Sequence, residues 1–160
     1  MNRKIAALGL FAAVAIIFGY VETLIPVFAG IPGIKLGLAN LSILYILINY
    51  SFREAAAVSV IRIIVIGFMF GNMFSIIYSL CGAALSMTVM TLLLRKTQSS
   101  IMAVSVAGGI THNIGQLIIA ALIVENRAVF FYTPVLLISG MVTGLLIGYL
   151  TAEVSRRVRF

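Results

Sequence analysis

The sequence contains no aspartate, and its four acidic residues are all glutamates. Magnesium prefers carboxylate oxygens as ligands, and four scattered glutamates cannot assemble the cluster that it needs. A Ser–His–Asp triad is impossible without aspartate, and no GxxxxGK[ST] loop for a nucleotide phosphate is present. These absences predict that this chain alone is not an enzyme and that it uses no metal or other cofactor.

Charged residues are also scarce. They make up 9% of the 160 residues, whereas 62% are hydrophobic, and tryptophan is absent. A soluble domain is typically about 45–50% apolar and about 25% charged, so this chain cannot cover an apolar core with a polar shell. We therefore predict that it is dissolved in the lipid bilayer. The single cysteine, Cys81, excludes an internal disulfide and any multi-cysteine metal site.

The apolar residues fall into six runs. A membrane-spanning helix needs about 20 mostly apolar residues. The predicted spans are residues 5–25, 34–50, 54–71, 74–94, 101–123 and 132–154. Because five apolar runs follow the first, we expect that run to be an uncleaved span and not a leader peptide. The sequence thus predicts an all-α integral membrane protein with one domain, 1–160, of six transmembrane helices.

The net charge of +7 comes from basic residues in the short segments between these runs. Such a pattern is typical of a membrane protein and gives no reason to expect nucleic-acid binding. With the N-terminus in the cytoplasm, eight basic residues lie inside and only Lys35 and Arg127 lie outside. Cytoplasmic loops carry the excess of Lys and Arg, so both termini are predicted to be cytoplasmic.

Polar residues inside the predicted spans are the candidate functional groups. Ionisable side chains at membrane depth are costly and usually face a cavity or a partner. At 1.5 Å per helical residue, Arg62 lies about 13 Å and His112 about 16 Å from the cytoplasmic face. The outer half holds four more polar residues: Glu22, Asn40, Asn72 and Gln116.

Each of these residues has a structural alternative. Arg62 either pairs with Glu22 or backbone carbonyls, or binds an anion in a central cavity. His112 is either an interhelical hydrogen-bonding group or a ligand contact, and lacks the partners of a metal site. Gly108, His112 and Gln116 recur at spacing four and share one helix face. Asn113 is displaced from that face by about 100°.

Small residues recur at spacing four on two predicted helices. Such ridges let helices approach closely within a membrane. They serve either packing inside the bundle or docking onto another membrane protein. The residues are Gly140, Gly144 and Gly148 on the last helix, and the pairs Gly9/Ala13 and Ala15/Gly19 on the first.

Several segments together resemble one known family. They are IPGIKLGLANLSILYIL (31–47), GFMFGNMFSIIYSLCGAALS (67–86), GGITHNIGQL (108–117) and PVLLISGMVTGLLIGYL (134–150). The chain resembles the bacterial Gx transporter family, often labelled heptaprenyl diphosphate synthase component I. The resemblance covers nearly the whole chain, and KLGLAN and HNxGQ are its most specific parts.

Members of that family resemble the S components of energy-coupling factor (ECF) transporters. The resemblance implies a six-helix protein of the bacterial cell membrane that binds a small solute from outside and depends on a coupling protein and two ATPases. S components commonly dock through AxxxA on the first helix, where this chain has GxxxA and AxxxG. Family members are also associated with flavoproteins of extracellular electron transfer, which implies an alternative partner.

We therefore expect an S-component-like subunit for uptake of a small anionic or amphipathic solute. The alternative is a non-catalytic membrane subunit of a prenyl-quinone synthesis or flavin-linked electron transfer assembly. An autonomous prenyltransferase is not expected, because the usual magnesium-binding aspartates are missing.

The predicted solute site is Glu22, Lys35, Asn40, Arg62, Asn72, His112, Asn113 and Gln116. Lys35 either snorkels to water or leans over a cavity containing Asn40. The predicted docking residues are Gly9, Ala13, Ala15 and Gly19.

Overall fold

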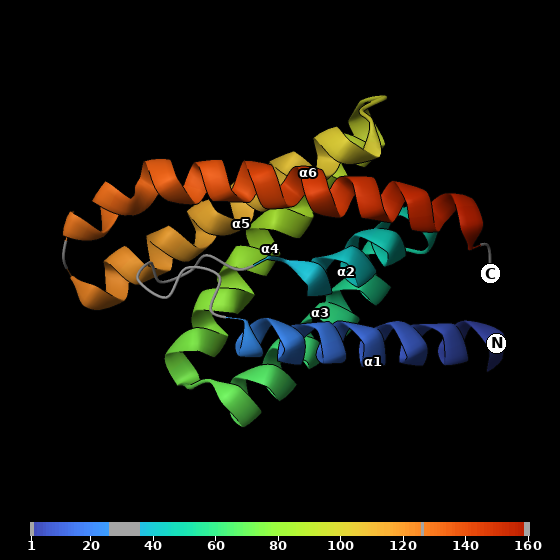
Figure 1. Cartoon of the computed structure of the whole chain (residues 1–160), viewed down its shortest axis with the longest axis horizontal. Helices are drawn as coiled ribbons and strands as arrows, with labels where there is room; N and C mark the ends of the chain where they lie inside the picture. The colour runs from blue at the N-terminus through green and yellow to red at the C-terminus, as the bar shows by residue number, and fades with distance from the viewer. Residues whose placement is uncertain (1, 26–35, 126, 159–160) are drawn as a thin grey trace.

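The computed structural model describes residues 2–25, 36–125 and 127–158, and these ranges are almost entirely helical (Figure 1). The elements are α1 (Asn2–Leu24), α2 (Leu38–Asn49), α3 (Phe52–Phe70), α4 (Met73–Lys96), α5 (Ile101–Val124), the 3₁₀ helix η1 (Arg127–Tyr132) and α6 (Thr133–Arg157). Each α-helix overlaps one of the six predicted segments. The predicted all-α class is therefore confirmed.

Local sequence explains where the later helices begin. The side chain of Asn72 accepts a 2.8 Å hydrogen bond from the Ser75 backbone N–H, and the Ser75 hydroxyl reaches back to the Asn72 backbone. This capping box ends α3 and starts α4 without a long loop. The hydroxyl of Ser100 caps α5 in the same way. Pro134 lies in the first turn of α6, where proline breaks no helical hydrogen bond.

Four helices are long and apolar enough to cross a membrane: Arg3–Leu24, Met73–Lys96, Ile101–Val124 and Val129–Arg157. The chain is therefore a multi-pass membrane protein. The described part of α2 has only 12 residues, which is about 18 Å of helix. Helix α3 has 19 residues but carries Arg53, Glu54 and Arg62. For α2 and α3, spanning remains a prediction.

The helices form two layers along the long axis of the molecule (Figure 1). In one layer α5 packs between α4 and α6, and in the other α1 packs against α2 and α3. Contacts of α3 with α4 and of α2 with α6 join the layers. The two ends of the chain lie at the same end of the bundle, on the right in Figure 1.

Helix α2 lies in the core. Residues 42–47 are all buried, and the ring of Tyr45 lies 4.8 Å from that of Phe11 on α1. The Tyr45 hydroxyl donates a 2.9 Å hydrogen bond to the carbonyl of Val158, at the end of α6. A helix enclosed on all sides needs no polar face, which explains why α2 is mostly apolar.

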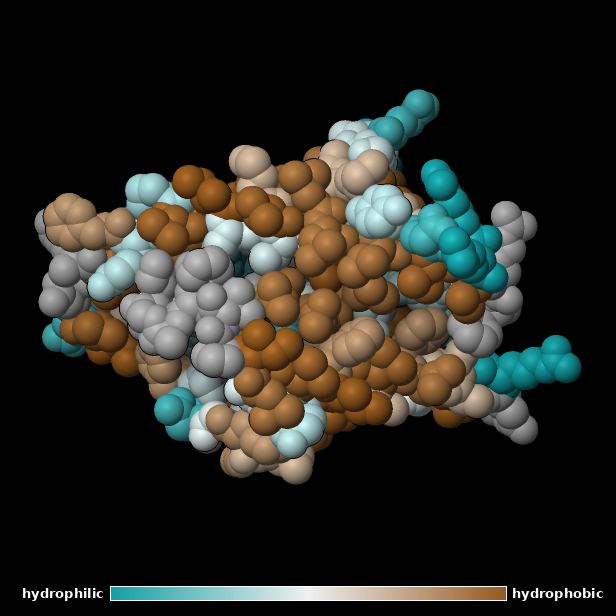
Figure 2. All heavy atoms as spheres, viewed as in Figure 1, coloured by the Kyte–Doolittle hydropathy of each residue, from teal (hydrophilic) through white to brown (hydrophobic). Residues whose placement is uncertain are grey.

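The exterior is apolar around the middle of the bundle and polar mainly at its ends. Figure 2 shows a wide hydrophobic surface between hydrophilic groups, which gather most densely at the end where the termini lie. Large apolar side chains such as Leu10, Phe68, Leu122 and Ile138 are more than half exposed. A surface of this kind suits lipid and not water.

Glycines allow the closest helix contacts. Gly140, Gly144 and Gly148 are buried, and a Cβ at any of them would meet backbone atoms of α5. This ridge on α6 therefore packs inside the bundle, which is the first of the two alternatives given by the sequence.

The small residues of α1 divide between two environments. Ala15 is fully buried, and Gly19 is buried beside Ile66 of α3. These two residues pack within the bundle, which is the first of the two alternatives given by the sequence. Gly9 and Ala13 are exposed, and a Cβ at Gly9 would meet nothing within 4 Å. A docking role for them stays a prediction.

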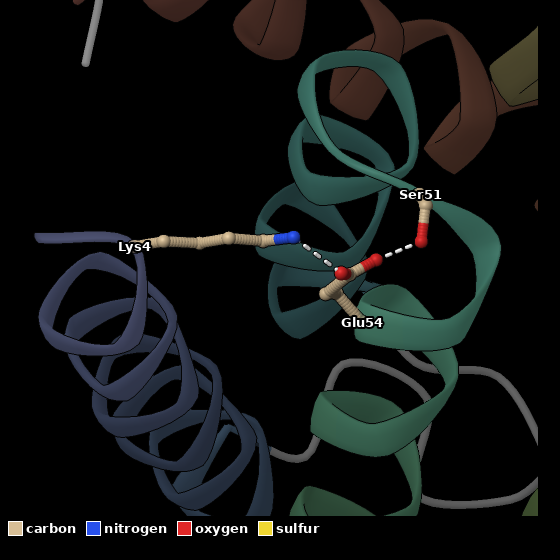
Figure 3. Close-up of polar contacts among 3 residues, drawn as sticks. All are labelled: Lys4, Ser51 and Glu54. Carbon is tan, nitrogen blue, oxygen red and sulfur yellow. Dashed lines mark hydrogen bonds and ion pairs between the residues drawn. The ribbon is translucent and has the colours of Figure 1, made fainter. Parts of the chain in front are cut away.

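An ion pair ties the start of α1 to the start of α3. Lys4 Nζ lies 2.6 Å from Glu54 Oε1, and the hydroxyl of Ser51 donates to the other oxygen of the same carboxylate (Figure 3). The pair lies at the end of the bundle that holds both termini.

Candidate functional site

A cavity of about 210 Å³ lies between the two helix layers. All six α-helices contribute to its wall, whereas the sequence predicted a site among the first, second, third and fifth helices. Six predicted site residues line it together: Glu22, Asn40, Arg62, His112, Asn113 and Gln116. Polar residues that are far apart in the sequence therefore meet in one place.

Two predicted site residues are not found in that wall. Lys35 lies outside the described residues. Asn72 is exposed and caps α4, so its assignment to the cavity is corrected. Its neighbour in the capping box, Ser75, lines the cavity in its place.

Arg62 on α3 interacts with polar groups of two neighbouring helices, α1 and α2. Its Nη2 donates a 3.2 Å hydrogen bond to Oδ1 of Asn40 on α2, and the negative charge of Glu22 on α1 acts on it. Glu22 in turn accepts a 2.6 Å hydrogen bond from the backbone N–H of Leu38, in the first turn of α2. Arg62 Nε is buried without a hydrogen-bond partner among the described residues. The guanidinium therefore retains donor capacity at the cavity.

His112 and Gln116 project from α5, and Gly82 of α4 makes room for both. A Cβ at Gly82 would lie 2.8 Å from Gln116 Cγ and 3.1 Å from His112 Cε1. Gln116 is 2% exposed, and its Oε1 has no hydrogen-bond partner among the described residues. A buried acceptor without a partner is unfavourable, so this atom is suited to receive a donor from a ligand.

Gly108, which shares the helix face of His112 and Gln116, does not line this cavity. A Cβ there would meet the side chain of Met90, and its carbonyl accepts a 2.8 Å hydrogen bond from Ser86. Its small size serves the contact between α4 and α5. The next residue, Gly109, lines the cavity instead.

Asn113 connects α5 to α6. Its Nδ2 donates a 2.6 Å hydrogen bond to the carbonyl of Leu136 and lies 3.4 Å from Ser139 Oγ. Asn113 therefore both lines the cavity and bonds two helices, with its side-chain donor already used.

The sequence reasoning missed Ser79 on α4 and Thr143 on α6, which also line the cavity. A signal was available: Ser75, Ser79 and Ser86 recur at helical spacing in an apolar helix, as do Ser139 and Thr143. Small hydroxyl residues can bond their own helix backbone, as Thr143 does to Ser139, so the pattern alone is not specific.

The described residues contain no group of three or more His, Cys, Asp or Glu side chains that could hold a metal ion. The cavity wall instead offers one guanidinium, one carboxylate, one imidazole, amides and hydroxyls. Such a wall can hydrogen-bond a polar molecule and balance its charge.

A family model described as heptaprenyl diphosphate synthase component I matches residues 11–154. This range begins in α1 and ends in α6, so it includes every described residue of the cavity wall. No curated protein matches the chain, and no solved structure does.

Proposed function

The chain belongs to the family described as heptaprenyl diphosphate synthase component I, and on this premise we propose that it is a non-catalytic, membrane-embedded binding subunit. Its cavity holds a small anionic or amphipathic solute. The sequence has no aspartate with which to bind magnesium. Any reaction that involves the bound molecule is therefore assigned to a partner.

The convergence of Arg62, Asn40 and Gln116 on one cavity carries this proposal. Arg62 supplies a permanent positive charge and a free Nε donor, and Gln116 supplies a free acceptor. Burying such groups costs free energy unless a partner satisfies them. Both atoms are closed to solvent in this structure. An oxyanion at Arg62 together with an N–H or O–H group at Gln116 satisfies both atoms once the two side chains turn toward the ligand.

We further propose that 1–160 is one six-helix transmembrane domain of the bacterial cell membrane, with both termini in the cytoplasm. The position of both termini at one end of the bundle supports this orientation, as does the excess of basic residues on that side. The cavity then lies toward the outer face. In this arrangement the chain takes up its solute as an S-component-like subunit, energised by a coupling protein and ATPases.

The family description favours a second candidate, a membrane component of a prenyl diphosphate or prenyl-quinone synthesis assembly. A cavity of about 210 Å³ suits a polar head group, while a long prenyl chain would lie along the apolar exterior. A flavoprotein of extracellular electron transfer is a further partner for the same subunit role. The exposed Gly9/Ala13 face of α1 is available for docking in each case.

Mass spectrometry of the full chain purified in mild detergent tests the proposal. We expect a small molecule to accompany the native chain and the Gly9→Ala variant, because Gly9 does not line the cavity and a Cβ there would meet nothing within 4 Å. We expect Arg62→Met to lose it. A molecule retained equally by Arg62→Met overturns the assignment. Co-purification of ATPases supports the transport role, and a synthase or flavoprotein subunit supports the second.

A further inference from the structure

A second, smaller cavity of about 40 Å³ adjoins the first. The two cavities share five wall residues: Gly37, Asn40, Gly109, His112 and Thr143. These shared residues form the boundary between the larger cavity, called the outer cavity below, and the smaller one, called the inner cavity. Gly37 has a φ of 75°, which favours glycine, and this conformation brings the start of α2 to the junction.

The inner cavity differs in character from the outer one. Its wall includes Leu44, Met87, Met90 and Ile147 beside the hydroxyls of three serines, and among the described residues it contains no charged side chain. Methionine side chains are flexible and adapt to varied shapes. The inner cavity therefore favours an apolar group, whereas the charges of Arg62 and Glu22 are confined to the outer cavity.

We propose that the two cavities form one elbowed site for an amphipathic ligand, with His112 and Asn40 at the constriction between them. The polar head lies in the outer cavity near Arg62, and a short apolar end passes the constriction into the inner cavity. At about one water-sized sphere per non-hydrogen atom, the inner cavity has room for roughly three atoms. This inference rests on the proposed solute-binding function and specifies the class of ligand.

Three serines allow a direct test, because replacing serine by cysteine changes little volume. Ser59 lines the inner cavity, is 2% exposed and makes no hydrogen bond through Oγ among the described residues. Ser79 lines the outer cavity. Ser42 is fully buried and likewise unpartnered, but it lines neither cavity. It is the matched control for Ser59.

The experiment measures labelling of each single-cysteine variant by methyl methanethiosulfonate, a small reagent that adds only an S–CH3 group to the thiol. It uses the full chain in detergent with the native thiol removed by Cys81→Ala. The probes are straight-chain carboxylates from acetate to hexanoate. We expect every carboxylate to slow labelling at Ser79→Cys. At Ser59→Cys, protection should strengthen by about fourfold in affinity for each buried methylene. The gain in protection with chain length should level off after roughly three carbons, because the inner cavity is then full. Ser42→Cys should stay unlabelled.

The outcomes separate the two proposals. Failure of all carboxylates to protect Ser79→Cys contradicts the proposed function itself. Protection of Ser79→Cys without chain-length-dependent protection of Ser59→Cys overturns the elbowed site and leaves solute binding intact. If Ser59→Cys is labelled no faster than Ser42→Cys, the elbowed site is overturned as well.

The constriction has its own readout. In the Ser59→Cys background, His112→Ala should speed labelling several-fold, because His112 is the one ring among the described residues that line both cavities. His112→Phe keeps a ring there and should leave labelling slow. Equal rates in the two variants contradict a constriction at His112.

Discussion

The guanidinium of Arg62 on α3 donates a 3.2 Å hydrogen bond to the side-chain oxygen of Asn40 on α2. This bond joins two helices of one layer, and both side chains line the cavity between the two layers. It also explains how a charge can persist in an apolar bundle, since Asn40 and the nearby Glu22 compensate part of its lost hydration. The cavity can thus hold a charged group because the hydrogen bond from Arg62 to Asn40 and the nearby charge of Glu22 compensate it.

Removing either partner of this bond should destabilise the fold. Asn40→Leu leaves the buried cation with one acceptor fewer, and hydrogen bonds to charged groups contribute about 1.5–3 kcal/mol. We expect a loss of free energy of unfolding in that range, measured by denaturant titration in mixed micelles. In a cycle with Arg62→Met, the double variant should lose less than the sum of the single losses. Strict additivity would show that the two side chains do not interact.

Helix contact through glycine provides a second prediction. A Cβ at Gly109 would meet the carbonyl of Gly140 on α6, and backbone cannot move aside as a side chain can. We expect Gly109→Ala to lower the free energy of unfolding by about 1–3 kcal/mol. Gly9→Ala is the control, because its Cβ meets nothing and alanine favours helix by about 1 kcal/mol. Equal melting temperatures for the two variants would contradict the packing.

Neighbouring amides on α5 should respond in opposite directions. Asn113→Leu removes a 2.6 Å hydrogen bond to Leu136 of α6 and should cost about 1 kcal/mol. Gln116→Leu removes a buried acceptor that has no partner among the described residues, so stability should hold or rise. The same Gln116→Leu variant should bind the carboxylate probes more weakly. A large loss of stability in Gln116→Leu would contradict its assignment to ligand binding.

Much of the fold could be predicted because the sequence leaves few alternatives. Apolar runs separated by polar or glycine-rich breaks place the six α-helices, with boundaries that differ by a few residues. The junction at Asn72 was the least distinct, since the apolar run is barely interrupted, yet the capping box fixes it. The helix η1 lacked any periodic signal.

The site could be predicted only in part. Helical spacing places His112 and Gln116 on one face of α5, but it does not show whether that face lines a cavity. Gly108 and Gly109 show the limit. Gly108 shares the face of His112 but packs against Met90 of α4, whereas Gly109, one residue further, lines the outer cavity. The inner cavity depends on contacts among helices, which no single helix pattern contains.

The ion pair between Lys4 and Glu54 should matter little for stability. Lys4 is 53% exposed, and exposed pairs contribute about 0–1 kcal/mol because water and salt screen them. We expect Lys4→Met to change the free energy of unfolding within that range, with the difference vanishing in high salt. Arg157→Met tests the second pair, Arg157–Glu153, as a control of the same kind. A salt-independent loss well above that range would show a buried pair.

The orientation in the membrane provides the last prediction. Both termini lie at one end of the bundle, the end that also holds Arg53 and the Arg95–Lys96 turn. Reporter tags fused to the two termini should therefore be reached from the same side of sealed vesicles, and that side should be the cytoplasmic one. A tag inserted beside Glu125, where α5 ends, should be reached from the opposite side.

Substitution of basic residues tests whether charge sets this orientation. Because Lys and Arg near span ends set orientation, replacing Arg95 and Lys96 by glutamine weakens the bias without touching the cavity. We expect a fraction of the chains to invert, with both terminal tags changing sides together. Termini found on opposite sides would contradict an even number of spans. That result would leave α2 or α3 outside the set of crossing helices.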